Sequence, residues 1–334
     1  MGMSNIAIVI PTYNRPAKLK RALASCFAQT TRPAQIIVVD NGSNPDTQKV
    51  VQEFQAQHGE RVAYCQSEPF KGRAALATGL AKVQEDWVIL LDDDDFLVTD
   101  RVENDLKTIE SVPEEVILIA HDFVRTDFQT HLVWLHRLAP EKLTLESALG
   151  LDHFGPPPAA TWRASVVKRH HPFHFDEGWF DYDLIASALQ HGRAVASGRV
   201  GYIMDDTRAG VRETTSSDKP VRLVLLHGER YEKVPAQFGL DPARVKKRIS
   251  EQAAFYAGKI LGVRAWTSPY APHVRRHPVE FMKGRLAPLR LAVTKAAGRF
   301  LPEMRGAKTY PLAQFAVVEP KLAGWIEVNA NPAI

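Results

Sequence analysis

Apolar runs alternate with helical repeats along the first 120 residues of the chain. Short runs rich in Val, Ile and Leu predict buried strands, and apolar residues spaced three or four apart predict amphipathic helices. The predicted strands are 6–10, 36–39, 62–65, 87–91 and 116–120, and the predicted helices are 16–29, 46–57, 72–84 and 102–110. Strands separated by helices of this length predict an α/β fold with a mostly parallel sheet and right-handed crossovers.

Polar residues follow three of these strands, at 12–15, 40–43 and 92–95, where four aspartates stand in a row. Because parallel strands present their carboxyl ends at one edge of a sheet, we expect the three loops to converge. Four adjacent carboxylates repel one another, and oxygen ligands of this kind suit Mg²⁺ or Mn²⁺ carrying a phosphorylated ligand. The alternative is a solvated acidic turn before the next helix.

Each loop offers groups that suit a nucleotide. Asp40 can accept a hydrogen bond from a base N–H, and Thr12 and Tyr13 offer a hydroxyl and a flat ring. Arg15 and Arg73 are candidates for phosphate contact, because a guanidinium matches phosphate geometry. The alternatives are ordinary. The Asp40 loop is also good turn chemistry, and Arg15 also suits a solvated position before a helix.

Four segments, in this order and spacing, resemble the family-two glycosyltransferases of the GT-A fold. They are 8–15, 37–43, 71–80 and 87–95, and the last is similar to the family's strand that ends in a DxD signature. The third departs from the pattern at Ala77, where the family commonly has Asn. The resemblance implies a single nucleotide-sugar-binding domain with a mostly parallel central sheet. It implies that the nucleotide is bound by Pro11, Thr12, Tyr13, Asn14, Arg15, Asp40, Asn41, Arg73, Asp92 and Asp93.

The resemblance also implies a metal site and a catalytic base. Asp94 corresponds to the family's metal-binding Asp, and Asp92 is expected to contact ribose or to assist the ion, Mg²⁺ or Mn²⁺, through water. Residues 180–184 are similar to the segment that carries the base. Phe180 stands at the first position of the family's acidic pair, so Asp181 is the expected base. Asp183 is the alternative, although it also suits the first turn of the following helix.

Further contacts to the diphosphate or the acceptor are expected from Trp179, Asp95, Asp183, Arg208 and Arg212. The family often carries a His near an Arg in a mobile loop. Here the segment 202–217 has arginines and no His, so an arginine contact to the diphosphate is expected in its place. The segment 121–138 is expected to be a β-ribbon packed on the core, with a border of the acceptor site as the alternative. The resemblance covers about residues 4–215.

The 334-residue chain has an acidic first part and a basic last part. Residues 221–334 carry 19 Lys and Arg against 8 Asp and Glu, a formal charge of +11, which leaves −7 for the rest of a chain whose net charge is +4. We therefore expect a catalytic domain over 1–218 and a basic, mainly helical region over 219–334. Asp241 and Pro242 predict a helix start. The segment 279–301 predicts two amphipathic helices, because Pro288 interrupts it.

The basic region is a candidate for packing on the catalytic domain, for a homo-oligomer contact, or for contact with an anionic membrane surface. Nucleic acid is not an expected partner, because no recognised binding motif accompanies the charge. No signal peptide or spanning segment is predicted. We expect a cytoplasmic protein, with the inner face of the membrane as a candidate location. The two cysteines, Cys26 and Cys65, are expected to be reduced.

The implied reaction is inverting transfer of a sugar from a nucleoside diphosphate, with uracil as the favoured base, to a hydroxyl of a glycan or lipid-linked acceptor. Surface polysaccharide or glycoconjugate synthesis is the expected setting. One alternative is a nucleotidyltransferase, which normally has a Gly-rich loop with Arg and Lys where this chain has residues 11–14. The other is a non-catalytic nucleotide-binding scaffold on a degenerate transferase fold.

Overall fold

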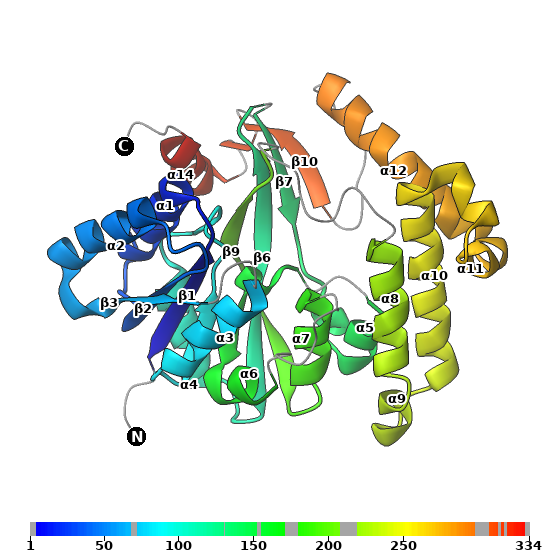
Figure 1. The fold of residues 1–334 in the computed structure, drawn as a ribbon, viewed down its shortest axis with the longest axis horizontal. Coiled ribbons are helices and arrows are strands. Elements are labelled where there is room, and N and C mark those ends of the chain that lie inside the picture. Colours follow the sequence, from blue (N-terminus) through cyan, green and yellow to red (C-terminus); the bar gives the residue numbers. More distant parts are fainter. Residues whose placement is uncertain are drawn as a thin grey trace.

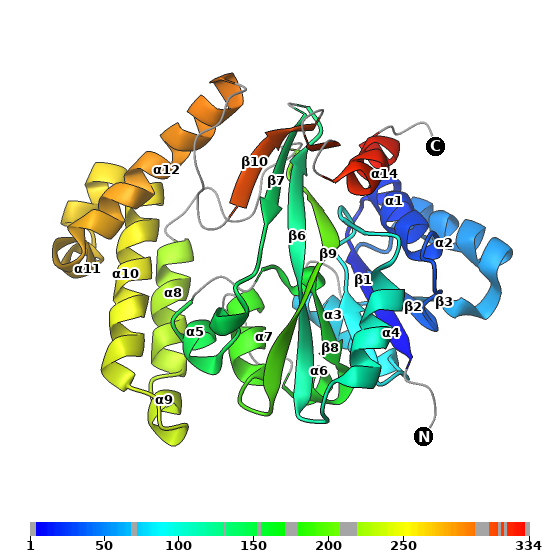
Figure 2. The ribbon, with the colours of Figure 1, turned by 180° about the vertical axis from the view of Figure 1, so that it is seen from behind.

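The computed structural model describes residues 5–67, 72–129, 131–151, 155–170, 180–207, 219–297, 307–312, 315–316 and 319–330. A ten-stranded sheet runs through the molecule, and helices cover both of its faces (Figures 1 and 2). The strands are β1 (Ile6–Thr12), β2 (Gln35–Asp40), β3 (Val62–Gln66), β4 (Trp87–Leu90), β5 (Phe96–Leu97), β6 (Val116–Asp127), β7 (Leu132–His136), β8 (Ala160–Arg163), β9 (Arg193–Asp205) and β10 (Ala307–Pro311).

The helices alternate with these strands and then dominate the last third of the chain. The α-helices are α1 (Pro16–Phe27), α2 (Pro45–His58), α3 (Gly72–Lys82), α4 (Arg101–Ser111), α5 (Leu145–Leu149), α6 (Ala164–His170), α7 (Phe180–Ala188), α8 (Lys219–Arg230), α9 (Val234–Gln237), α10 (Pro242–Ile260), α11 (Ala271–Arg276), α12 (Pro278–Ala297) and α14 (Pro320–Ala330). Short 3-10 helices are η1 (Gly59–Arg61), η2 (Pro140–Lys142), η3 (Pro157–Ala159) and η4 (Gly262–Thr267).

The sheet has the order β10-β7-β6-β8-β4-β1-β2-β3, with β9 paired to both β6 and β5. Strands β3, β2, β1 and β4 form the parallel core that the alternating pattern predicts. Beyond β4 the sheet is mixed, because β8 runs antiparallel to β4 and β6 while β9 runs parallel to β6. The ribbon predicted over 121–138 is confirmed as the antiparallel pair of β6 and β7. The predicted α/β fold class is confirmed.

Alternate residues of each core strand face opposite layers of helices, as the two-residue period of a strand requires. On β1, Ala7 and Val9 pack with apolar residues of α3, α6 and α7, whereas Ile8 packs with those of α1, α2 and α4. Helix α3 approaches the sheet closely at Gly79, where a methyl group would overlap Val9 and lie 2.9 Å from Cγ2 of Val39. The close packing of α3 on the sheet therefore requires a glycine at position 79.

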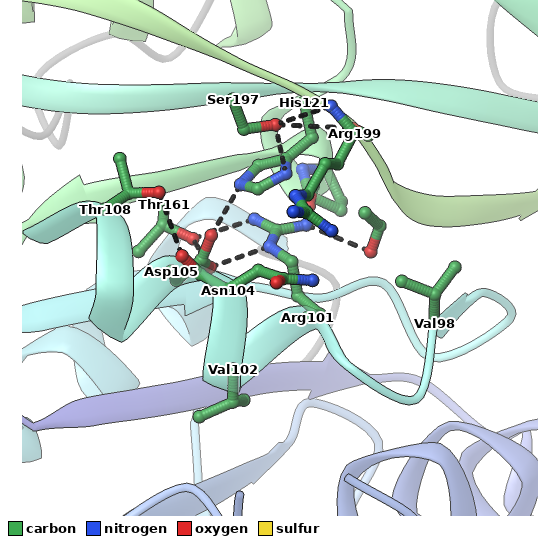
Figure 3. A network of polar contacts seen from close by, with 12 residues as sticks. Val98, Arg101, Val102, Asn104, Asp105, Thr108, His121, Thr161, Ser197 and Arg199 are labelled. Atoms are coloured by element: carbon green, nitrogen blue, oxygen red, sulfur yellow. Dashed lines mark hydrogen bonds and ion pairs between the residues drawn. The ribbon is translucent and has the colours of Figure 1, made fainter. Parts of the chain in front are cut away.

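A polar cluster buried between α4 and the sheet holds the mixed part of the sheet together (Figure 3). Arg101 donates from Nε to Asp105 at 2.7 Å, from Nη2 to Thr161 at 2.8 Å, and from Nη1 to the carbonyl oxygen of Gly201 at 3.1 Å. Nε2 of His121 lies 2.6 Å from Asp105. One guanidinium thus joins α4, β8 and β9.

The same cluster fixes the charge state of its carboxylate. Burial alone raises the pKa of Asp105, but the charge of Arg101 and the interactions with His121 and Thr161 outweigh burial and lower the pKa to about 2. Burial and the nearby Arg101 lower the pKa of His121. The folded protein therefore holds an ionised carboxylate in its interior, which is stable only while its donors stay in place.

Helices α8 to α12 stand beside the sheet, at the right of Figure 1. Asp241 caps α10 by accepting from the backbone N–H of Ala243 at 2.9 Å, as the sequence predicts. Helices α10 and α12 cross where glycines face backbone. A methyl group at Gly258 would overlap the carbonyl oxygen of Phe281, and one at Gly284 would overlap that of Phe255. The crossing depends on the missing side chains.

The predicted break at Pro288 is wrong, because α12 continues from Pro278 to Ala297. A proline inside a helix removes one backbone hydrogen bond, which bends a helix without always ending it. Phe281 and Gly284 pack on α10 just before this point. The tertiary contact therefore holds α12 in a helix through a residue that alone favours a break.

The end of the chain returns to the sheet. Strand β10 pairs antiparallel with β7, and α14 follows it against β5, where Nε1 of Trp325 donates to the carbonyl oxygen of Leu97 at 3.0 Å. Phe315 and Ile326 are buried in a cluster with Phe96. The last part of the predicted helical region thus packs with the sheet, and the domain boundary at 218 stays a prediction.

Candidate functional site

The loops after β1 and β4 meet at the carboxyl edge of the parallel core. The hydroxyl of Thr12 donates to Oδ2 of Asp93 at 2.7 Å. Nη1 of Arg15 lies 3.0 Å from Asp94 and 3.3 Å from Asp93. The sheet imposes this meeting, because the parallel pairing of β1 with β2 and β4 brings all three strands to the same edge. The convergence expected from the sequence is present.

The loop after β2 has a rigid framework centred on a fully buried carboxylate. Asp40 accepts hydrogen bonds from the N–H of Gly42 at 2.9 Å, from the N–H of Asn44 at 3.0 Å and from the hydroxyl of Tyr64 at 2.9 Å. A methyl group at Gly42 would lie 2.6 Å from Oδ1 of Asn14, so the β1 and β2 loops come this close only because residue 42 is glycine. The base contact expected of Asp40 stays a prediction.

The four aspartates differ in their surroundings. Asp95 is buried and accepts from the hydroxyl of Tyr202 and, at 2.7 Å, from the N–H of Asp205, so it ties the loop to β9. Asp93 is also buried and is held by the β1 loop. Asp94 is half-buried, and Asp92 is exposed. Of the four, Asp92 and Asp94 are the carboxylates that reach the surface of the site.

Negative charge accumulates at this surface. Crowding by protein atoms and then the charges of Asp94, Asp181 and Asp93 raise the pKa of Asp92, although the side chain keeps contact with solvent. Burial and the charges of Asp92 and Asp94 raise the pKa of Asp95 well above its ordinary value. Asp181, on the first turn of α7, is therefore near enough to the aspartate loop for their charges to interact.

The residues present fit a divalent cation that is completed by substrate phosphates. After burial, the charges of Asp94, Asp181 and Asp93 also raise the pKa of Asp92, so a cation here would relieve repulsion between carboxylates. Mg²⁺ is commonly held by one or two carboxylates plus phosphate oxygens, which Asp92 and Asp94 can provide. No group of three or more His, Cys, Asp or Glu that could hold a metal is found in the part of the chain that the structure describes. The protein would thus supply only part of the coordination shell.

Two basic residues of the site were not predicted from the sequence. Nζ of Lys18 lies 3.2 Å from Asp94, and Arg21 pairs with Asp205 at 2.5 Å and donates to the carbonyl oxygen of Asp94 at 2.8 Å. The sequence held a signal for them, because Arg15, just before α1, and Lys18 and Arg21, within α1, stand three residues apart and so lie on one side of the helix. Asp205 gives no such signal, since the pairing of β9 with β5 and β6 brings it here.

Asp183 occupies a different environment from Asp181. It is fully buried, and it lies 2.9 Å from Nδ1 of His227 and accepts from Nη1 of Arg230. Its backbone carbonyl accepts from the hydroxyl of Tyr231 at 3.1 Å. These partners belong to α8 and the turn after it, so Asp183 fastens α7 to α8, whereas Asp181 is partly exposed and its charge contributes to the raised pKa of Asp92.

Some predicted residues cannot be placed. Trp179, Arg208 and Arg212 lie outside the described residues, and the side chain of Arg73 does too. Tyr13 is 37% exposed beside the converging loops, and Asn41 is buried there, with its side-chain oxygen accepting from Ser67 at 3.3 Å. The structure thus brings the β1 loop, the β2 loop, the aspartates and Asp181 to one edge, and their individual roles stay predictions.

Comparison with known proteins agrees with this geometry. The family described as Glycosyl transferase family 2 matches residues 7–169. An uncharacterized glycosyltransferase of Haemophilus influenzae is 31% identical over 107 residues, which are 32% of this chain and 42% of the relative. The GalNAc(5)-diNAcBac-PP-undecaprenol beta-1,3-glucosyltransferase of Campylobacter jejuni is 32% identical over 99 residues, 29% of this chain and 32% of the relative. The chain spans less than half the length of these relatives.

Solved structures share the fold over most of the chain. The structure of S. aureus TarS 1-349 in complex with UDP-GlcNAc has a TM-score of 0.60 at 14% identity, covering 96% of this chain and 89% of that one. Mannosyltransferase PcManGT from Pyrobaculum calidifontis, in complex with GDP-Man and Mn²⁺, has a TM-score of 0.54 at 16% identity, covering 99% and 85%. Residues 7–169, which hold the converging strand-end loops, therefore carry a glycosyl transferase family 2 domain.

Proposed function

We propose that this protein is an inverting glycosyltransferase that moves a sugar from a nucleoside-diphosphate donor, with UDP favoured, to an acceptor hydroxyl. The carrying observation is that the loops after β1, β2 and β4 converge at one acidic edge of the sheet, where the charge of Asp181 contributes to the raised pKa of Asp92. We assign the enzyme to the cytoplasm and to surface polysaccharide or glycoconjugate synthesis. Family membership supports the class of reaction, and the site supports the assignment of roles.

The donor would lie across the converging loops. Asp40, Thr12 and Tyr13 would surround the base, and the buried carboxylate of Asp40 is already fixed in direction by its three donors. Arg15 and Lys18 pair with Asp94 at 3.0 and 3.2 Å without ligand. In the donor complex, Arg15 and Lys18 would contact diphosphate oxygens in place of part of their pairing with Asp94, since the diphosphate and the carboxylate both attract these cations.

Asp94 and Asp92 would hold Mg²⁺ or Mn²⁺. Bound there, the ion supplies positive charge that offsets the charge developing on the leaving diphosphate. Side chains of the protein supply the remaining interactions. Lys18 and Arg21 of α1 balance the charge of the carboxylates, and Asp95, which accepts from Tyr202 and Asp205, keeps the loop after β4 in position.

Asp181 would take the proton from the acceptor hydroxyl, which is the role of a general base in a single displacement with inversion. The surroundings of Asp183 support this choice. Both its oxygens are engaged by His227 and Arg230, and it is fully buried. Asp181 is partly exposed and electrostatically coupled to Asp92.

The relatives support the finer parts of the proposal by analogy. TarS is seen with UDP-GlcNAc, and PcManGT with GDP-Man and Mn²⁺. The Campylobacter relative is named for an undecaprenol-linked acceptor. A glycan or lipid-linked acceptor is therefore part of the proposal for this chain.

The test combines donor binding with turnover. Calorimetry with UDP, GDP and TDP, with and without Mn²⁺, should show one nucleotide whose binding needs the metal and is lost in Asp94→Ala. With the matching donor sugar, Asp181→Asn should lower turnover by about 100-fold or more while donor binding is kept. Asp46→Asn, an exposed carboxylate of α2, is the matched control and should behave as wild type.

Two results would overturn the proposal in different ways. Near-full transfer by Asp181→Asn with unchanged donor binding would remove the base assignment. Failure of every nucleotide to bind, with or without metal, would favour the non-catalytic scaffold instead.

A further inference from the structure

Helix α12 has two faces with different surroundings. Phe281, Gly284 and Ala287 are buried, and the first two meet α10 at the glycine crossing. Val279, Met282 and Leu286, spaced three and four residues apart, lie on the other side of the helix and are 64%, 50% and 42% exposed. They border a shallow hollow with Pro278 and Lys283, away from the acidic site. The outer face of α12 is thus apolar and open to solvent.

Helix η4, which packs beside α12, carries two further exposed apolar side chains. Val263 is 74% exposed and Trp266 is 40% exposed. The Trp266 ring packs edge-on against the ring of Phe281, with centroids 5.6 Å apart, so η4 and α12 are held side by side. Among the described residues, five of the seven exposed large hydrophobic side chains belong to these two helices. We call these five, Val263, Trp266, Val279, Met282 and Leu286, the η4–α12 surface.

Positive charge surrounds the η4–α12 surface. Residues 261–287 hold five exposed cations and a single carboxylate, that of Glu280, which pairs with Lys283 at 2.7 Å. The cations are Arg264, Arg275, Arg276, Lys283 and Arg285. Figures 1 and 2 show α11 beyond α10 at the outer margin of the molecule, and α12 running from there past the end of α10. An apolar stripe with cations beside it is therefore exposed on this part of the molecule.

We propose that the η4–α12 surface docks on an anionic membrane leaflet. The apolar side chains would enter the boundary between headgroups and acyl chains, and the arginines and lysine would meet anionic headgroups. None of the described helices combines the length and apolar character needed to cross a bilayer. The proposal concerns surface contact, and it holds or fails independently of sugar transfer.

Charge selects the membrane over a second copy of the chain. A symmetric contact between two copies would place the same cationic border against itself, which is repulsive. Nucleic acid would satisfy the cations, but it would leave the exposed aliphatic side chains of α12 in water. An anionic lipid surface satisfies both features at once.

The test is sedimentation of the full chain with vesicles of phosphatidylcholine alone or mixed with phosphatidylglycerol. We expect binding to the mixed vesicles that weakens as salt rises, and little binding to phosphatidylcholine alone. The apolar variant replaces Val279, Met282 and Leu286 by Ser, and the charge variant replaces Arg275, Arg276 and Lys283 by Gln. Each should weaken binding by about tenfold or more.

Matched controls alter exposed residues elsewhere. Phe238→Ser removes a 46% exposed aromatic at the end of α9, and Arg32→Gln with Lys49→Gln removes two exposed cations near β2 and α2. Both should bind vesicles as wild type does. All altered side chains are exposed, so circular dichroism should show retained folding.

The proposal is overturned if wild type ignores the mixed vesicles, or if the apolar and charge variants bind as tightly as wild type. Equal losses in the control variants would also overturn it. Light scattering tests the alternative occupant, a second copy of the chain. If the wild type forms a dimer that the apolar variant does not form, and does not bind vesicles, the membrane proposal is wrong.

Discussion

The crossing of α10 and α12 gives a prediction with a matched control. A methyl group at Gly284 would overlap the carbonyl oxygen of Phe255 and lie 2.9 Å from its carbonyl carbon and 3.0 Å from the backbone nitrogen of Lys259. These atoms belong to the backbone of α10 and cannot turn aside as a side chain would. In Gly284→Ala the two helices must therefore separate by about 1.5 Å to restore ordinary van der Waals contact.

Two opposing terms set the magnitude. Over-packing a tight contact costs about 1–3 kcal/mol, and the rigid atoms met here favour the upper end. Alanine restores about 1 kcal/mol, because glycine is the poorer helix former. We expect a net loss of about 1–2 kcal/mol in the free energy of unfolding. Gly258 lies at the same crossing. In the double variant, Gly258→Ala should lower the free energy of unfolding by less than it does alone, because Gly284→Ala has already separated the helices.

Urea unfolding measures these differences, and Gly324→Ala is the control. Gly324 lies in α14 with no atom within 4 Å of an added methyl group, so the same change there should stabilise by about 0.5–1 kcal/mol. If Gly284→Ala matched the control, the close crossing described for α10 and α12 would be wrong.

The remaining predictions concern buried carboxylates. In Arg101→Met, Asp105 loses its main cation, and urea unfolding should show a loss of about 3–5 kcal/mol. Because the folded pKa of Asp105 is about 2, its contribution of about 2 kcal/mol is present above pH about 4 and is lost as the pH falls toward 2, a slope that Asp105→Asn should flatten. Asp183→Asn should destabilise the fold by more than Asp181→Asn does, because His227 and Arg230 both contact the buried carboxylate of Asp183.

Clear results would contradict each of these. Wild-type stability in Arg101→Met would mean that the cluster in Figure 3 does not hold the sheet. An unchanged acid slope in Asp105→Asn would remove the link to that carboxylate. Equal effects of the changes at Asp181 and Asp183 on stability would contradict their different surroundings.

The sequence alone determined the parallel core and the edge at which the site lies. The apolar runs of β1, β2 and β4 alternate with helices, and local pattern fixes both kinds of element. Topology then requires that the loops after these strands share one edge. Thr12 and Asp93 are 81 residues apart, yet their meeting follows from this rule. The fold class and much of the candidate site were therefore accessible from pattern.

Packing between distant segments determines which charges meet and which helices continue. Asp205 reaches Arg21 because β9 pairs with β5, and Asp183 turns to His227 because α8 packs beside α7. Helix α12 passes through Pro288 because its glycine face is held on α10. Such contacts join residues far apart in the chain, and local propensity is weak beside the packing energy of a buried surface. The same packing left the η4–α12 surface exposed, which no spacing of residues could decide.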